Sequence, residues 1–237
     1  MRLRTQLAPV LLCLFLAGCS SSTASHVNTI TLNTEAVPEN LSVYVNDEPQ
    51  KAKTNNGDIN LSVPAGQTNL ISVETEEPAI IYQVEVTDET KEPVSLKFDP
   101  TKNQEIIQQV SDSLNSYFKA VNNKKNAISY LSKDSILDPQ KLYNHSYKSA
   151  VLYSTSFKTS SVNNKPELIV RVDTESSKSP SYTWTYEFRL LLEDGKWKIF
   201  HQRLLYEVLD GNLFYENEAG TYPGPQSPGP NDIVLSF

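Results

Sequence analysis

The chain has 237 residues, with 28 acidic and 21 basic side chains and a formal charge of −7 at pH 7. This excess of acid argues against nucleic acid as a partner and against a polybasic patch for a membrane surface. With 8 glycines and 2 cysteines, the chain has little material for phosphate-binding loops or for a disulfide framework.

The N-terminus has the pattern of an export signal. Arg2 and Arg4 precede an apolar stretch of about a dozen residues, which is too short to cross a ~30 Å hydrocarbon layer as a helix. Residues 16–19, LAGC, close this stretch and resemble the lipobox of bacterial lipoproteins. The resemblance implies that the signal peptide 1–18 is removed and that Cys19 is lipidated, so that the protein is held on the extracytoplasmic face of a membrane. It leaves open whether that is the cell membrane or, in a Gram-negative cell, the outer membrane.

Lipidation of Cys19 has two consequences. Cys13 lies in the segment that would be removed, so no free thiol and no disulfide are expected in the mature chain. Each buried methylene stabilises membrane attachment by roughly 0.8 kcal/mol, and two acyl chains suffice for stable anchoring without a transmembrane helix. Residues 19–28 are mostly small and polar after the cysteine, which predicts a flexible lipidated tether.

Residues 29–99 are expected to form a small antiparallel β-sandwich. Apolar and polar residues alternate in runs at 41–46, 58–66, 68–75, 79–86 and 93–98. Turn signals, such as Asn56 followed by Gly57, separate these runs. The segments VYVN and VPAG resemble the PEGA-like β-domains of bacterial envelope proteins.

Residues 101–209 begin with helical patterns. Thr101 and Gln104 fit a capping box, and apolar residues then recur every three or four positions as far as Val121. Residues 124–131 and 138–148 predict a second and a third helix.

Long strands are predicted after these helices, at 149–162, 167–174, 181–195 and 196–208. In the last strand the apolar positions change parity between Ile199 and Phe200, which indicates a bulge or bend. Helices followed by long antiparallel strands predict an α+β class, with the helices packed on one face of a curved antiparallel sheet.

Two segments resemble a known fold. IIQQVSDSLNSYFKAVNNKKNAISYLS and LLLEDGKWKIFHQRLLYE are similar to the cone-shaped fold of nuclear transport factor two. Within that group, the C-terminal domains of the teicoplanin-resistance-associated envelope proteins of Gram-positive bacteria are the relatives that they resemble. The resemblance implies a cone-shaped α+β domain at 101–209, after the β-sandwich, in a protein of the cell envelope.

Residues 210–237 form a tail with four prolines and without Lys or Arg. The segment YPGPQSPGP excludes a helix and predicts an extended conformation. Two alternatives stay open for the apolar end IVLSF, which either pairs as an edge strand or is loose.

The sequence offers little for catalysis or metal binding. Its three histidines, His26, His145 and His201, have no metal-ligand spacing, and the glycine-rich and nucleophile motifs of common enzymes are missing. We therefore expect no metal and no cofactor.

Four residues are candidates for a pocket inside the expected cone: Trp184, Tyr186, His201 and Asp173. The aromatic residues from Tyr182 to Phe188 either line a ligand cavity or pack as core beneath the first helix. His201 shares its parity with Trp197 and is expected to face inward, as either a catalytic base or a hydrogen-bonded structural group.

On the other parity, Arg171 and Arg189 either form a basic strip for an anionic cell-wall polymer, or are solvated or paired with neighbours such as Glu187. The expected function is a non-catalytic binding or organising role in the envelope, toward a cell-wall polymer or an envelope protein, with an envelope-stress or antibiotic response as one setting for it. The alternative is an enzyme of the isomerase or dehydratase type that acts on a small apolar substrate. An open cavity from Trp184 to His201 or Asp173 would favour the enzyme.

Overall fold

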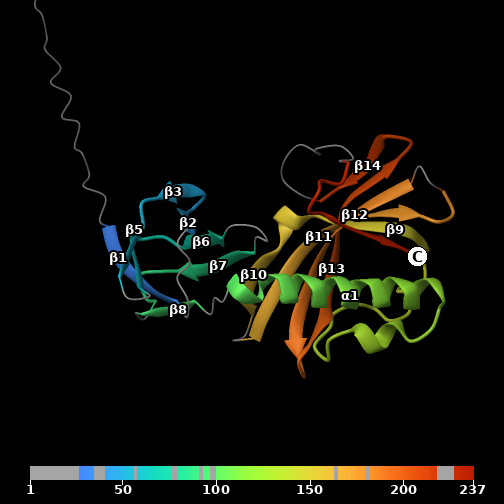
Figure 1. The fold of residues 1–237 in the computed structure, drawn as a ribbon. Coiled ribbons are helices and arrows are strands. Elements are labelled where there is room, and N and C mark those ends of the chain that lie inside the picture. Colours follow the sequence, from blue (N-terminus) through green and yellow to red (C-terminus); the bar gives the residue numbers. More distant parts are fainter. Residues whose placement is uncertain are drawn as a thin grey trace, which may run out of the picture.

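The computed structural model describes residues 27–34, 41–55, 58–75, 80–90, 93–96, 100–162, 165–179, 182–217 and 227–237. The leader, the proposed lipidation site Cys19 and the tether up to residue 26 lie outside these ranges. β-Strands predominate, and the described part of the chain contains one α-helix, α1 (Asn103–Asn122) (Figure 1).

The described residues between 27 and 96 form short strands. They are β1 (Val27–Thr34), β2 (Leu41–Val45), β3 (Glu48–Gln50), β4 (Lys53–Asn55), β5 (Asp58–Pro64), β6 (Asn69–Thr75), β7 (Ile81–Val86) and β8 (Val94–Leu96). The alternation in the sequence is also an alternation in burial, because Ile59, Leu61 and Val63 of β5 are buried and the residues between them are not. These strands contribute their apolar faces to one hydrophobic core.

The expected antiparallel sandwich is wrong, because the strands of this region belong to two sheets of mixed direction. One sheet has the order β4-β5-β1-β8, in which β8 runs parallel to β1. The strands β3, β2, β6 and β7 belong to a larger sheet, in which β7 runs parallel to a strand from the second half of the chain.

Longer strands follow α1. They are β9 (Tyr147–Leu152), β10 (Lys158–Val162), β11 (Lys165–Ser176), β12 (Tyr182–Glu193), β13 (Lys196–Leu209), β14 (Asn212–Glu216) and β15 (Ile233–Ser236). The larger sheet contains eleven strands in the order β14-β13-β12-β11-β10-β7-β6-β2-β3, with β9 paired to β11 and β15 paired to β9. Three 3-10 helices, at Pro100–Lys102, Ala127–Tyr130 and Ser154–Ser156, complete the described elements.

Helix α1 lies along one face of the strands β11 to β13 (Figure 1). Its apolar stripe, with Val110, Leu114 and Phe118 fully buried, follows the spacing of three and four that the sequence predicts. The ring of Phe118 meets Phe188 of β12 edge-on, with 5.7 Å between the ring centroids. Helix and sheet therefore share an aromatic core.

The α+β class predicted from the sequence is wrong, and with it the cone-shaped domain of several helices on an antiparallel sheet. The protein is mostly β, its large sheet is mixed, and α1 is the single α-helix among the described residues. Residues 124–131 give a 3-10 turn in place of the second helix, because Lys124 and Asn126 take left-handed backbone angles, with φ of 53° and 57°.

The expected third helix, at 138–148, is also not formed. The bonds from Lys141 N–H to Asp138 and from Asn144 N–H to Lys141 close short turns, both of the i to i+3 type. The side chain of Asn122 then accepts a hydrogen bond from the N–H of Tyr147 (2.8 Å) and donates to its carbonyl (2.7 Å). These bonds fix the start of β9 where the helix was expected.

The larger sheet runs through both halves of the chain without a break. β7 and β10 pair in parallel, with Ile81 opposite Lys158, and the Ile81 N–H donates to the carbonyl of Phe157 at 2.9 Å. The boundaries drawn at 29–99, 101–209 and 210–237 stay predictions, and the backbone hydrogen bonds of one sheet connect the first two regions.

The C-terminal end pairs as an edge strand, which is one of the two alternatives left open for it. β15 pairs antiparallel with β9, with Leu235 opposite Ala150. The ring of Phe237 packs against Phe118 at 5.2 Å between centroids, so the last residue joins the core beneath α1. The carboxylate of Asp232 accepts the N–H of Ser154 (2.7 Å) just before β15 begins.

The bend expected near Ile199 is confirmed. In the pairing of β12 with β13, Leu190 lies opposite Ile199 and Arg189 lies opposite His201, so that Phe200 is an extra residue. This bulge reverses the direction of the side chains that follow it, which decides the face on which His201 lies.

Candidate functional site

The four residues expected to share a pocket lie on two different faces of the sheet. Trp184 and Tyr186 lie on the face that α1 covers, together with Phe188. His201 pairs across the ladder with Arg189, and Asp173 pairs with Thr185, so both lie on the opposite face. The expectation that His201 faces inward is wrong, because the bulge at Phe200 reverses its direction.

Trp184 and Tyr186 are core residues in the described structure. The indole of Trp184 is 6% exposed and meets the rings of His145 and Tyr182 edge-on, at centroid distances of 4.7 and 4.8 Å. Its Nε1 donates to Glu207, which also accepts the hydroxyl of Tyr182. The aromatic residues of β12 therefore pack as core and do not line a ligand cavity. The space that a small substrate would need at Trp184 is filled by side chains.

Buried hydroxyls also occupy the region beneath α1. Tyr117 donates a hydrogen bond to Gln202 at 3.0 Å. Burial raises the pKa of Tyr117, Tyr147 and Tyr186, so these hydroxyls stay protonated at any ordinary pH. Burial likewise lowers the pKa of His145, so its ring is neutral at pH 7. The region beneath α1 is therefore a packed core of aromatic rings with protonated tyrosine hydroxyls and a neutral histidine.

Asp173 is held in a local cluster. The hydroxyl of Tyr153 donates to its carboxylate at 2.6 Å, and the Nε of Arg171 lies 4.0 Å away. The pKa of Tyr153 is raised, by burial first and then by Asp173. Arg171 also lies near the faces of two aromatic rings, 6.0 Å from the centroid of Tyr153 and 5.4 Å from that of Tyr206. The cluster gives Asp173 a structural role.

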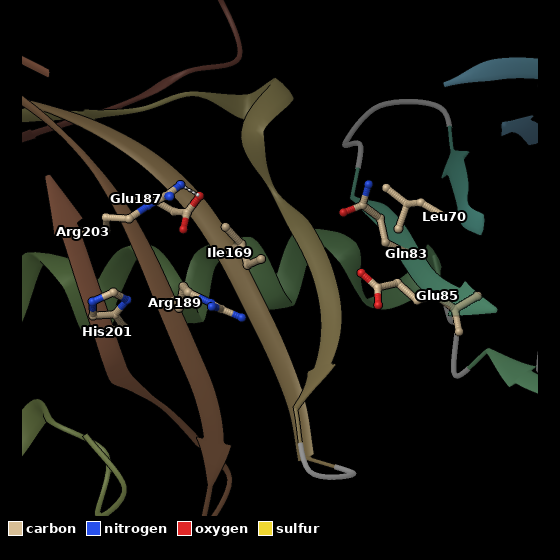
Figure 2. Close-up of a pocket in the computed structure, with 9 residues that line it drawn as sticks. Leu70, Gln83, Glu85, Ile169, Glu187, Arg189, His201 and Arg203 are labelled. Atoms are coloured by element: carbon tan, nitrogen blue, oxygen red, sulfur yellow. Dashed lines mark hydrogen bonds and ion pairs between the residues drawn. The ribbon is translucent and has the colours of Figure 1, made fainter. Parts of the chain in front are cut away.

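The face away from α1 carries a groove between β12 and β13 on one side and β6 and β7 on the other (Figure 2). Its volume is about 410 Å³, within the usual size of a small-ligand site. We name it the arginine groove, and define it by its lining residues Leu70, Gln83, Val84, Glu85, Ile169, Glu187, Arg189, His201 and Arg203. Gln83 and Glu85 point toward β11, and the guanidinium of Arg189 points toward them (Figure 2).

Ion pairs fix both arginines of the groove. Arg189 donates to Glu167 at 2.7 Å, and Glu167 is fully buried. Arg203 donates to Glu187 at 3.1 Å. The hydrogen bond with Glu167 raises the pKa of Arg189, so this guanidinium stays charged. Each arginine uses one Nη atom for its carboxylate, and a planar guanidinium held in this way is oriented in advance for a ligand.

His201 lies between the two arginines on the same face. Its pKa is lowered below the ordinary value of 6.5, mainly by burial and then by the charge of Arg189. The imidazole is therefore neutral at pH 7 and offers one donor and one acceptor to the groove.

Sequence reasoning found part of this site. It assigned Arg189 and Glu187 to one face of a strand, because strand residues alternate. Pairing of Arg189 with a neighbour such as Glu187 is one of the alternatives that the sequence leaves open, and in the structure its partner is Glu167. It missed Arg203, because the bulges in β13 break the alternation. It also missed Gln83 and Glu85, because the parallel pairing of β7 with β10 joins segments that no pattern in the sequence connects.

Among the described residues, no group of three or more His, Cys, Asp or Glu side chains is arranged to hold a metal ion. In the part of the chain that the structure covers, no helix combines the length and the apolar character needed to span a bilayer.

No protein-family model matches this chain, and neither a curated protein nor a solved structure matches it.

Proposed function

We propose that this protein is a lipid-anchored protein of the cell envelope with a non-catalytic role, which binds or organises a cell-wall polymer or an envelope protein outside the membrane. The arginine groove is the binding surface in this proposal. The observation that carries it is the placement of Arg189, His201 and Arg203 side by side on an uncovered sheet face, in a groove of ligand size.

The anchor is supported by the N-terminal sequence. The basic residues, the apolar stretch and the segment LAGC stand in the order of a lipoprotein signal. A diacylglyceryl group on Cys19 would hold the protein at the membrane through two acyl chains.

The geometry of the groove suits binding better than catalysis. Ion pairs with Glu167 and Glu187 hold Arg189 and Arg203, and among the described residues no carboxylate is hydrogen-bonded to His201 to orient it as a general base. The isomerase or dehydratase alternative required one cavity from Trp184 to His201 or Asp173. The sheet itself separates Trp184 from the other two residues, so no observation favours that alternative.

Anchoring is tested by labelling cells with an alkyne fatty acid. The wild-type protein and a Cys13→Ala variant should carry the label and fractionate with membranes, and Cys19→Ala should lose both properties. A Cys19→Ala protein with undiminished label would refute the anchor. The binding role is tested by sedimenting the purified Cys19→Ala chain with insoluble cell wall. Loss of co-sedimentation in a Glu187→Gln/Arg203→Gln variant, which leaves the Arg189–Glu167 pair intact, would support the groove. A wild-type protein that does not sediment with cell wall would contradict a wall-polymer ligand.

A further inference from the structure

We infer that the arginine groove binds a neutral, hydroxyl-rich ligand, a stretch of glycan, in preference to an anionic polymer. This inference rests on the proposed function, because it names the ligand of the same groove. It also departs from the sequence-based expectation that the arginines on this face form a basic strip.

The first argument is charge balance. The groove is lined by two guanidiniums, of Arg189 and Arg203, and by two carboxylates, of Glu85 and Glu187. The fully buried Glu167 lies against Arg189 as well, at 2.7 Å. The wall of β12 and β13 is therefore not a field of net positive charge, and a polyanion would compete with Glu167 and Glu187 for the guanidiniums and would approach Glu85.

The second argument is the alternation of donors and acceptors. Arginine offers hydrogen-bond donors only, and ionised glutamate offers acceptors only. Neutral histidine and glutamine each offer both donors and acceptors. Across the groove, Arg189 and Arg203 supply donors, Glu85 and Glu187 supply acceptors, and His201 and Gln83 supply both. A sugar hydroxyl is at once a donor and an acceptor, so it satisfies such a mixed lining where an anion satisfies only half of it.

The polar side chains of the groove are held in place before a ligand binds, and an apolar side chain lies on each side of the groove. The ion pairs hold the side chains of Glu187 and Arg203 in place, and the amide of Gln83 donates to Ser72 at 3.0 Å. Fixed polar groups lose little conformational freedom when a ligand binds. Leu70 and Ile169 lie on the two sides of the groove (Figure 2), where they can pack against the C–H faces of a sugar ring.

The test compares ligands of the two classes on the full chain carrying Cys19→Ala. Chitohexaose and cellohexaose are the neutral probes, and polygalacturonate and polyphosphate are the anionic ones. Isothermal titration at about 0.05 and 0.3 M NaCl should show binding of at least one neutral probe, with an affinity that changes less than about twofold, because an uncharged ligand is not screened. Stronger binding of an anionic probe, with an affinity that falls steeply with salt, would overturn the inference.

Variants then locate the binding. Gln83→Ala should weaken the neutral probe about tenfold, which corresponds to the loss of a ligand hydrogen bond, and it disturbs no ion pair of the groove. Glu187→Gln/Arg203→Gln should weaken it at least as much while keeping the net charge of the pair. Lys141→Gln, at an exposed site outside the groove, is the matched control and should bind normally. Unchanged affinity in both groove variants would overturn the inference.

The failure of this inference differs from that of the proposed function. If the protein sediments with cell wall through the groove but binds only the anionic probes, the proposed function stands and the glycan inference is refuted. If the protein binds neither cell wall nor any probe, both the proposed binding function and the glycan inference are refuted.

Discussion

His201 lies directly opposite Arg189 in the ladder of β12 and β13, on the sheet face that α1 does not cover. One extra residue, Phe200, produces this relationship. Without the bulge, the alternation of the strand would place His201 beneath α1, among the buried rings. The bulge thus places the neutral His201 beside Arg189 and Arg203, each of which is paired with a glutamate.

The pKa of His201 is the first testable consequence. NMR titration of the imidazole should give a pKa below the ordinary 6.5, because burial and the charge of Arg189 both disfavour the imidazolium. Arg189→Gln should raise this pKa only partway, because burial is the larger cause. A value at or above 6.5 in the wild-type protein would contradict the position assigned to the ring.

The same group makes stability depend on pH. The unfolded chain protonates His201 near pH 6.5, whereas the folded protein does so only at lower pH, so acid favours unfolding within that window. His201→Asn should therefore lose less stability than wild type between pH 7.5 and 5.5, as measured by thermal melts. His145, whose pKa is also lowered by burial, contributes to the wild-type loss in the same direction. Equal losses in wild type and His201→Asn would count against a lowered pKa.

Trp184→Ala should destabilise the protein by roughly 3–5 kcal/mol, because the indole is buried among rings that cannot fill its space. Phe214→Ala is the matched control, because that ring is 66% exposed, and it should change stability by no more than about 0.5 kcal/mol. Urea unfolding measures both. A Trp184→Ala protein as stable as the control would mean that the indole borders open space.

Arg189→Ala should cost about 3 kcal/mol or more of stability, because it leaves the buried carboxylate of Glu167 without its partner. A second change, Glu167→Gln, made in the same chain should restore much of the loss, because it removes the uncompensated charge. Denaturant unfolding of the two single variants and the double variant gives the coupling. Additive losses would show that the pair does not act as a unit.

Removal of residues 233–237 should loosen β9, because β15 pairs with it and Phe237 packs on Phe118. Hydrogen exchange at residues 149–152 should become faster, and the melting temperature should fall. Val234→Ala, at an exposed position of the same strand, should leave both nearly unchanged. Unaltered exchange after the truncation would mean that β15 does not protect this edge.

The sequence predicts local elements well and their assembly poorly. Period-two runs such as 58–64 and the apolar stripe from Ile107 to Val121 correspond to β5 and α1, since burial on one face leaves a direct trace in the residue order. The second expected helix fails because Lys124 and Asn126 adopt left-handed angles, which residue pattern alone does not reveal. The third fails because short i to i+3 turns follow Asp138, and the side chain of Asn122 then fixes Tyr147 at the start of β9.

The arginine groove could likewise be predicted from the sequence only in part. Glu187 and Arg189 share a face by simple alternation, so a polar strip is visible in the sequence. The opposite wall is not, because Gln83 and Glu85 reach the groove through the parallel pairing of Ile81 with Lys158, between strands far apart in the chain. Such non-local pairing depends on the packing of the whole sheet rather than on local preference.

The central claim is that the arginine groove is the ligand-binding surface of an envelope-anchored protein. Hydrogen-exchange mass spectrometry of the purified chain, with and without solubilised cell-wall polymer, tests it most directly. The account predicts that the ligand slows exchange in the peptides that cover 83–85, 187–189 and 201–203, and leaves the edge strand at 212–216 unchanged. Protection confined to 212–216, or no protection in any peptide at saturating polymer, would contradict it.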